Sequence, residues 1–211
     1  LGVGLSPFGL TYSPNIPLIL LNKSAVIFGG NIAVTCYAPI SYISAVVMLL
    51  MQGVSDGSQP LISLAYGEGK HDTTKAVRDL AYRFAFGVAV VCSVVLFLLR
   101  GSAAHLFGAS EQVTMLVAQI LPIFIIGFVF VSVSRVTTAY FYATGKNLWA
   151  YILIYGEPLT LCILLLILPN AMGSVNGTWV SVPLSQIIAM LLSLLLIHKN
   201  RTLEHQLPSH E

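Results

Sequence analysis

Hydrophobic residues occur in six long runs along the chain, and short polar segments separate the runs. A helix needs about 20 predominantly apolar residues to cross a hydrocarbon core of about 30 Å, and each run is long enough. The pattern therefore predicts an all-α fold, a polytopic transmembrane bundle of six helices. Their expected ranges are 5–28, 32–65, 80–99, 113–143, 148–168 and 179–197.

The polar segments set the expected domain organisation. A Gly29-Gly30-Asn31 turn separates the first two runs, and a longer polar connection at 66–79 precedes the third. We expect a six-helix transmembrane lobe at 1–198, followed by a polar cytoplasmic tail at 199–211. Because the first residues lack the basic and short apolar regions of a secretory signal, we expect the chain to begin within a longer protein.

Composition agrees with a membrane protein. The 211 residues are 56% hydrophobic and 9% charged, with a mean hydropathy of +0.86. A soluble domain carries about 25% charged residues. The net charge of +2 is small and the basic residues are dispersed, so no nucleic-acid partner is indicated. The expected surroundings are a lipid bilayer.

Motifs for catalysis or metal binding are absent from the sequence. The three cysteines lie far apart in apolar runs, and the five histidines lie in connections or the tail without HExxH or CxxC spacing. The segment Gly67-Glu68-Gly69-Lys70 lacks the spacing of a phosphate-binding loop. We therefore expect no enzymatic activity, no metal site and no bound cofactor.

Basic residues indicate the orientation of the chain. Seven of them fall on one side of a six-helix topology: Lys70, Lys75, Arg78, Arg83, Lys146, Lys199 and Arg201. Only Arg100 falls by a connection on the other side. Lys and Arg accumulate in cytoplasmic loops. We expect a multi-pass protein of the cell membrane, with both ends of this segment in the cytoplasm.

Three ionisable residues fall deep inside the predicted spans. Asp56, Arg135 and Glu157 each lie about 15 Å from the cytoplasmic boundary, at 1.5 Å per helical residue. A charge at the bilayer centre costs at least about 2.5 to 3.5 kcal/mol, so each needs a partner or water. An ion-paired cluster would leave one carboxylate incompletely neutralised and able to carry a coupling proton. A purely structural pairing of Arg135 with one acid explains the same residues.

Other polar residues are candidates for lining a cavity. Lys23 lies about 9 Å from the outer boundary, where its long side chain can reach the interface or a cavity. Asn22 beside it, and Gln59 on the same face as Asp56, can contact a solute. Intramembrane amides also commonly bond a neighbouring helix, so both interpretations stay open.

The segment Gly53-Val-Ser-Asp-Gly-Ser-Gln-Pro-Leu-Ile-Ser-Leu-Ala-Tyr-Gly-Glu-Gly69 resembles the eighth-helix region of the multidrug and toxic compound extrusion (MATE) family. Segments 22–30, 139–146 and 177–183 are similar to parts of the seventh, tenth and twelfth helices. Tyr140, in the second of these, is the fourth candidate for lining a cavity. Members have twelve helices in two six-helix lobes, and this sequence resembles the carboxy-terminal lobe.

The resemblance implies an antiporter that exports organic, often cationic, drugs in exchange for protons or sodium. Its partners would be a small organic substrate and a missing amino-terminal six-helix lobe, or a second copy of the chain. Sodium-coupled members carry acids in their seventh and tenth helices, where this sequence has Lys23 and Arg135, so a proton is favoured. The alternatives are a lipid-linked sugar flippase of the same wider superfamily, or a membrane assembly subunit that transports nothing.

Overall fold

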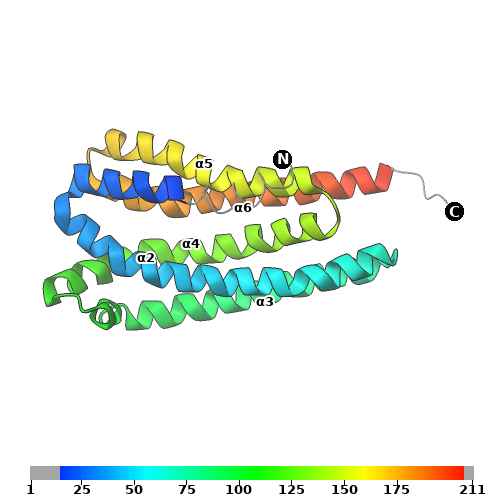
Figure 1. The fold of residues 1–211 in the computed structure, drawn as a ribbon, viewed down its shortest axis with the longest axis horizontal. Coiled ribbons are helices and arrows are strands. Elements are labelled where there is room, and N and C mark those ends of the chain that lie inside the picture. The colour runs from blue at the N-terminus through cyan, green and yellow to red at the C-terminus, as the bar shows by residue number, and fades with distance from the viewer. Residues whose placement is uncertain (1–14, 207–211) are drawn as a thin grey trace.

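The computed structural model describes the backbone of residues 15–206 and the side chains of residues 15–200. This part of the chain forms a bundle of long helices (Figure 1). The elements are α2 (Asn15–Gly67), α3 (His71–Leu99), the 3-10 helix η1 (Ala103–Phe107), α4 (Glu111–Ala143), α5 (Asn147–Met172) and α6 (Val175–Gln206). Five of the described helices are long and apolar enough to cross a membrane. The described part of the chain is therefore all-helical, with the long apolar helices of a multi-pass membrane protein.

The prediction of six separate helices is not confirmed, because the first two runs form the single element α2. Within α2 only Gly30 leaves helical geometry, with φ 67° and ψ −168°. Glycine has no Cβ and adopts this positive φ without strain. The dark-blue start of α2 and its cyan remainder run in nearly opposite directions (Figure 1). The expected turn at Gly29-Gly30-Asn31 is present as a kink at one residue; positions 5–14 lie outside the described residues.

The described α-helices all extend beyond the limits that hydropathy predicts, and two of them do so by the most. α3 begins at His71 rather than at residue 80, and α6 continues to Gln206 rather than ending at residue 197. Hydropathy identifies only the part of a helix that contacts lipid. The backbone hydrogen bonds of the helix can continue beyond that part into water. Asp72 in the first turn of α3 also interacts favourably with the positive end of the helix dipole. Residues 199–206 of the predicted tail are therefore helical.

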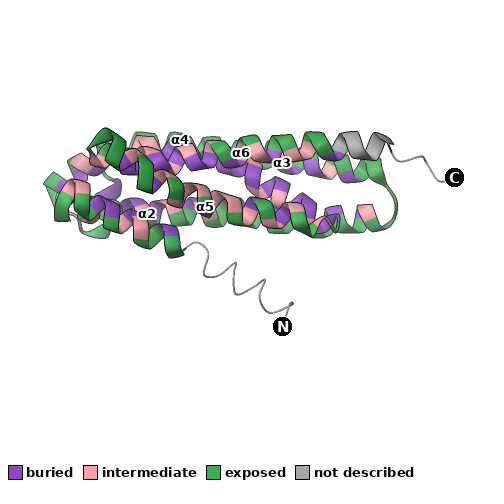
Figure 2. Ribbon diagram, turned by 90° about the horizontal axis from the view of Figure 1, so that it is seen from above, coloured by how far each residue is buried: buried purple, intermediate pink, exposed green. Residues whose placement is uncertain are grey.

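The central element is α4, which contacts α2, α3, α5 and α6. In its most apolar window 44% of the residues are buried, compared with 11% for α3 and α5. Buried positions face the interior of the bundle and exposed positions its outside (Figure 2). Near one end, Trp179 of α6 stacks on Tyr37 of α2, with ring centroids 5.9 Å apart, and lies 6.1 Å from Phe124 of α4. These rings fix three helices relative to one another.

The connections gather at two ends of the bundle. The α2–α3 and α4–α5 turns lie at the same end as the last part of α6, and the Gly30 kink, η1 and the α5–α6 turn lie at the other (Figure 1). Lys146 donates a hydrogen bond to Asn200, which joins the α4–α5 turn to α6. The basic residues predicted to share one side therefore do lie toward one end, which we call the basic end.

Candidate functional site

A polar stripe runs along one face of α2 and consists of Gln52, Asp56, Gln59 and Ser63. Their spacing of four, three and four residues places them within an arc of roughly 60° on a helix with 3.6 residues per turn. Gln52 Nε2 donates to Asp56 Oδ1 at 2.7 Å. On the surface of this chain Gln59 is half-buried and the other three residues are exposed.

The opposite face of the same helix segment is apolar. Leu50 and Leu61 are exposed to 48% and 58%, and both lie roughly half a turn away from the polar stripe. Leucine side chains suit contact with acyl chains. A carboxylate about 15 Å from the membrane boundary does not, because its desolvation is costly. The polar stripe must therefore face water or another protein surface, whereas Leu50 and Leu61 can face lipid.

The three predicted intramembrane charges lie on three different helices. Asp56 is on α2, Arg135 on α4 and Glu157 on α5, and both Arg135 and Glu157 are half-buried. Among the described residues no ion pair joins any two of them. Arg135 Nε is buried and has no hydrogen-bond partner within the described chain. The structure thus shows no ion-paired cluster in this lobe, and a coupling role for these residues stays a prediction.

The cavity-lining candidates are similarly dispersed. Asn22 Nδ2 donates to the carbonyl oxygen of Leu18 at 2.9 Å, so its amide is engaged within its own helix. Lys23 is exposed on the short segment before the kink. Tyr140 of α4 is only 3% exposed, and the guanidinium of Arg78 lies 5.2 Å from its ring centroid. Of the four candidates, Gln59 alone belongs to the polar stripe. The contacts do not test whether any of the four lines a cavity, so this role stays a prediction.

Sequence reasoning missed Gln186, a buried amide on α6. It is 4% exposed, and its Oε1 atom has no hydrogen-bond partner among the described residues. A Cβ added to Gly127 of α4 would lie 1.7 Å from this oxygen, so glycine at 127 is what lets the amide approach the central helix. The available signal was a glutamine inside the apolar run 179–197.

The fold and these polar positions define the class of the protein: a multi-pass helical bundle that carries ionisable groups inside its membrane spans. The family model described as MatE matches residues 19–172, which is more than half of the chain. The chain therefore belongs to the MatE family, the multidrug and toxic compound extrusion transporters. No curated protein sequence matches it.

Solved structures share the fold at low sequence identity. An outward-facing multidrug resistance MATE family transporter of the MOP superfamily is 17% identical with a TM-score of 0.85, and the match covers 94% of this chain. An inward-facing transporter of the same description is 16% identical with a TM-score of 0.83, over 95% of this chain. A MOP superfamily transporter from Pyrococcus furiosus, whose binding pocket is described as having reverse polarity, is 20% identical with a TM-score of 0.84, over 90%.

These matches cover 45%, 47% and 43% of the three solved chains. The chain thus spans about half the length of the transporters that it resembles. Its fold is that of a partial MATE-type protein, equivalent to one lobe.

Proposed function

We propose that the chain is the carboxy-terminal lobe of a secondary active antiporter that exports organic, often cationic, compounds in exchange for protons or sodium. The observation that carries this proposal is the polar stripe, which places the carboxylate of Asp56 on an exposed face at membrane depth. A water-filled cleft between this lobe and a companion lobe hydrates the stripe. In the cleft the carboxylate attracts an organic cation or holds a proton.

The similarity of the lobe to transporters in two different states supports this proposal. Its fold superposes on both an outward-facing and an inward-facing transporter, with TM-scores of 0.85 and 0.83. Alternating access by rocking of one helix bundle against another requires a bundle that keeps its shape in both states. The central position of α4, in contact with four other helices, provides such rigidity.

We favour the proton as the coupling ion. Among the described residues Asp56 and Glu157 have no cationic partner, so no ion pair neutralises either carboxylate. Lys23 and Arg135 place positive charge in the two helices where sodium-coupled members of the family carry acids. Collapse of the proton gradient is therefore expected to stop export, while removal of sodium is not.

The test is ethidium efflux from cells that produce the full-length protein, with Asp56→Asn and Glu157→Gln variants. The matched control is Glu68→Gln, because Glu68 lies in the exposed α2–α3 turn and pairs only with Lys70. We expect efflux to fall to the background rate in Asp56→Asn and to be unchanged in Glu68→Gln, at equal protein levels. Equal efflux in all variants and in cells lacking the protein contradicts the export of this class of compound.

A second candidate function is the transport of an anionic solute, such as a lipid-linked sugar. The buried, unpartnered Nε of Arg135 favours it, as does the fold shared with the Pyrococcus furiosus transporter described as having a pocket of reverse polarity. Arg135→Gln separates the two functions. A cation exporter keeps or increases its ethidium efflux when this positive charge is removed, whereas an anion transporter loses transport, with a defect in surface polysaccharide.

A further inference from the structure

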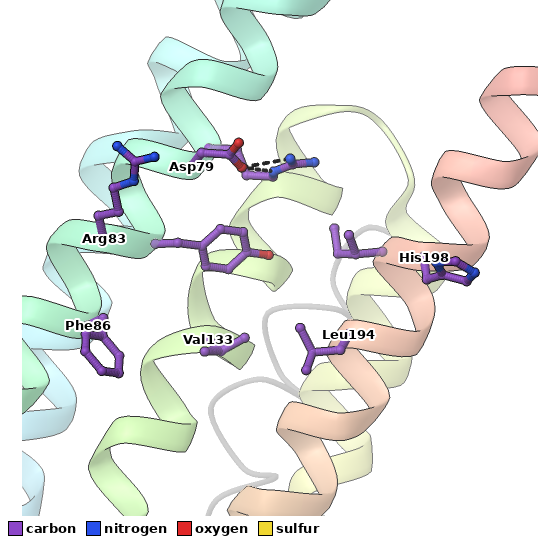
Figure 3. Close-up of a pocket in the computed structure, with 9 residues that line it drawn as sticks. Asp79, Arg83, Phe86, Val133, Leu194 and His198 are labelled. Carbon is purple, nitrogen blue, oxygen red and sulfur yellow. Dashed lines mark hydrogen bonds and ion pairs between the residues drawn. The ribbon is translucent and has the colours of Figure 1, made fainter.

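A pocket of about 530 Å³ opens between α3, α4 and α6, toward the basic end of the bundle. Helices α3 and α6 form its two walls, and α4 lies between them (Figure 3). Its lining includes Asp79, Arg83 and Phe86 from α3, Val133 from α4, and Leu194 and His198 from α6. This pocket is separate from the polar stripe, which lies on α2.

The polarity of the pocket changes with depth in the membrane. The expected boundary passes near residue 80 on α3 and residue 197 on α6, so Asp79, Arg83 and His198 lie at headgroup level. Phe86 and Leu194 lie about one helical turn deeper, roughly 4.5 to 6 Å toward the bilayer centre. They are exposed to 50% and 49%, so this part of the wall is open to acyl chains. The pocket therefore has polar side chains at its mouth and apolar side chains deeper in the membrane. This arrangement matches the headgroup and acyl chains of a phospholipid.

The polar mouth carries a surplus of positive charge. Arg78 is 2% exposed and donates from Nε and Nη2 to Asp79 Oδ1, at 3.0 and 2.8 Å, so it neutralises the acid of the pocket. Arg83 has no ion-pair partner in the described part of the chain. One guanidinium therefore stands at the mouth without a counter-ion, and arginine is well suited to hold a phosphate through two parallel hydrogen bonds.

We propose that this pocket binds an anionic phospholipid of the cytoplasmic leaflet. Arg83 contacts the phosphate of the headgroup, and one acyl chain lies against Phe86, Val133 and Leu194. The bound lipid fills the space between α3 and α6 and links the outer helices of the lobe. Basic pockets between transmembrane helices on the cytoplasmic side are suited to anionic headgroups.

Two other occupants fit the pocket less well. An organic cation would meet the uncompensated charge of Arg83, which repels it. Free phosphate would satisfy Arg83 but would leave the apolar wall unused, and burial of that wall is a large part of the available binding energy. Both alternatives are distinguished from a lipid by competition experiments.

The experiment is native mass spectrometry of the full-length protein in mild detergent, titrated with dioleoylphosphatidylglycerol or dioleoylphosphatidylcholine. We expect a retained phosphatidylglycerol adduct and about fivefold weaker binding in Arg83→Gln, as for the loss of one basic contact at a membrane surface. Arg83→Lys keeps part of the binding, because the charge remains but the two parallel hydrogen bonds of the guanidinium are lost. Lys75→Gln is the matched control, since Lys75 is exposed on the same helix outside the pocket, and its binding should equal that of the unmodified protein.

Arg83 is exposed, so its substitution does not disturb the core, and unchanged thermal unfolding of the variant verifies this. Equal binding of the two lipids, or equal loss in Arg83→Gln and Lys75→Gln, overturns the proposal. Competition by millimolar inorganic phosphate assigns the site to a free anion instead. Competition by ethidium assigns the pocket to the substrate and likewise overturns the lipid site. None of these readouts depends on transport, so the proposed function is tested separately.

Discussion

Tyr82 of α3 donates a hydrogen bond to Thr137 of α4, with the two oxygens 2.7 Å apart. The direction follows from the single proton of the threonine hydroxyl, which Thr137 already donates to the carbonyl oxygen of Val133 at 2.8 Å. The tyrosine is therefore the donor. This bond joins a peripheral helix to the central helix of the lobe, near the level of the proposed lipid headgroup.

Removal of the tyrosine hydroxyl should weaken the lobe slightly. Tyr82→Phe leaves the bond from Thr137 to Val133 intact, so we expect a loss of about 0.6 kcal/mol, the average for a side-chain hydrogen bond within a membrane. Thr137→Val removes both bonds and should cost more. Unfolding of the protein in detergent measures both variants; a larger loss in Tyr82→Phe than in Thr137→Val would contradict the assigned direction.

A close approach of α5 and α6 depends on a glycine. A Cβ at Gly177 would lie 2.7 Å from the carbonyl oxygen of Leu168 and from backbone atoms of Pro169, none of which can rotate away. Gly177→Ala should therefore destabilise the lobe by about 1 to 3 kcal/mol, as overpacking does.

Gly87 is the matched control, since nothing lies within 4 Å of an added Cβ in α3. Gly87→Ala should be neutral or stabilising by up to about 1 kcal/mol, because alanine is the better helix former. Thermal unfolding of the two variants side by side measures the difference. Equal stability of both would show that α5 and α6 do not pack this closely.

Sequence patterns predicted the helices well where lipid contact determines composition. A turn at Gly29-Gly30-Asn31 between two helices was also predicted, and the chain changes direction there at Gly30, whose φ of 67° few residues other than glycine adopt. The start of α3 at His71 was not, since the first turns of this helix are polar and hydropathy registers lipid rather than backbone hydrogen bonding. For the same reason the helical part of the 199–211 tail was missed.

The sequence predicts how deep the candidate residues lie in the membrane, but not which way each side chain points around the bundle. The residue count places Asp56, Arg135 and Glu157 at one level, yet the rotation of each helix decides whether they meet, and only packing fixes that rotation. Arg78 shows the same limit: its sequence position marks it as a cytoplasmic flanking residue, but contact with Tyr140 leaves it 2% exposed. Gln59 was predicted to share a face with Asp56 because both lie on one helix, whereas Gln52 and Ser63, the other members of the polar stripe, were missed.

The proposed orientation predicts which turns face the cytoplasm. Gly145 and Gly173 both lie in exposed turns with positive φ, at opposite ends of the bundle, and so accept short insertions. An epitope tag inserted after Gly173 should bind antibody on intact cells. A tag after Gly145 should bind only after permeabilisation, because that turn lies at the basic end. The reverse pattern would place both ends of this segment outside.

The central claim is that the polar stripe of α2 faces a water-filled cleft at membrane depth. Gln59→Cys and Leu61→Cys test it most directly, in a protein whose Cys36, Cys92 and Cys162 are changed to alanine. The two positions are about 3 Å apart along the helix but lie on opposite faces. Labelling in native membranes, with a charged thiol reagent added to both sides, should modify Gln59→Cys and spare Leu61→Cys. Equal labelling of the two, or labelling of Leu61→Cys alone, contradicts the cleft.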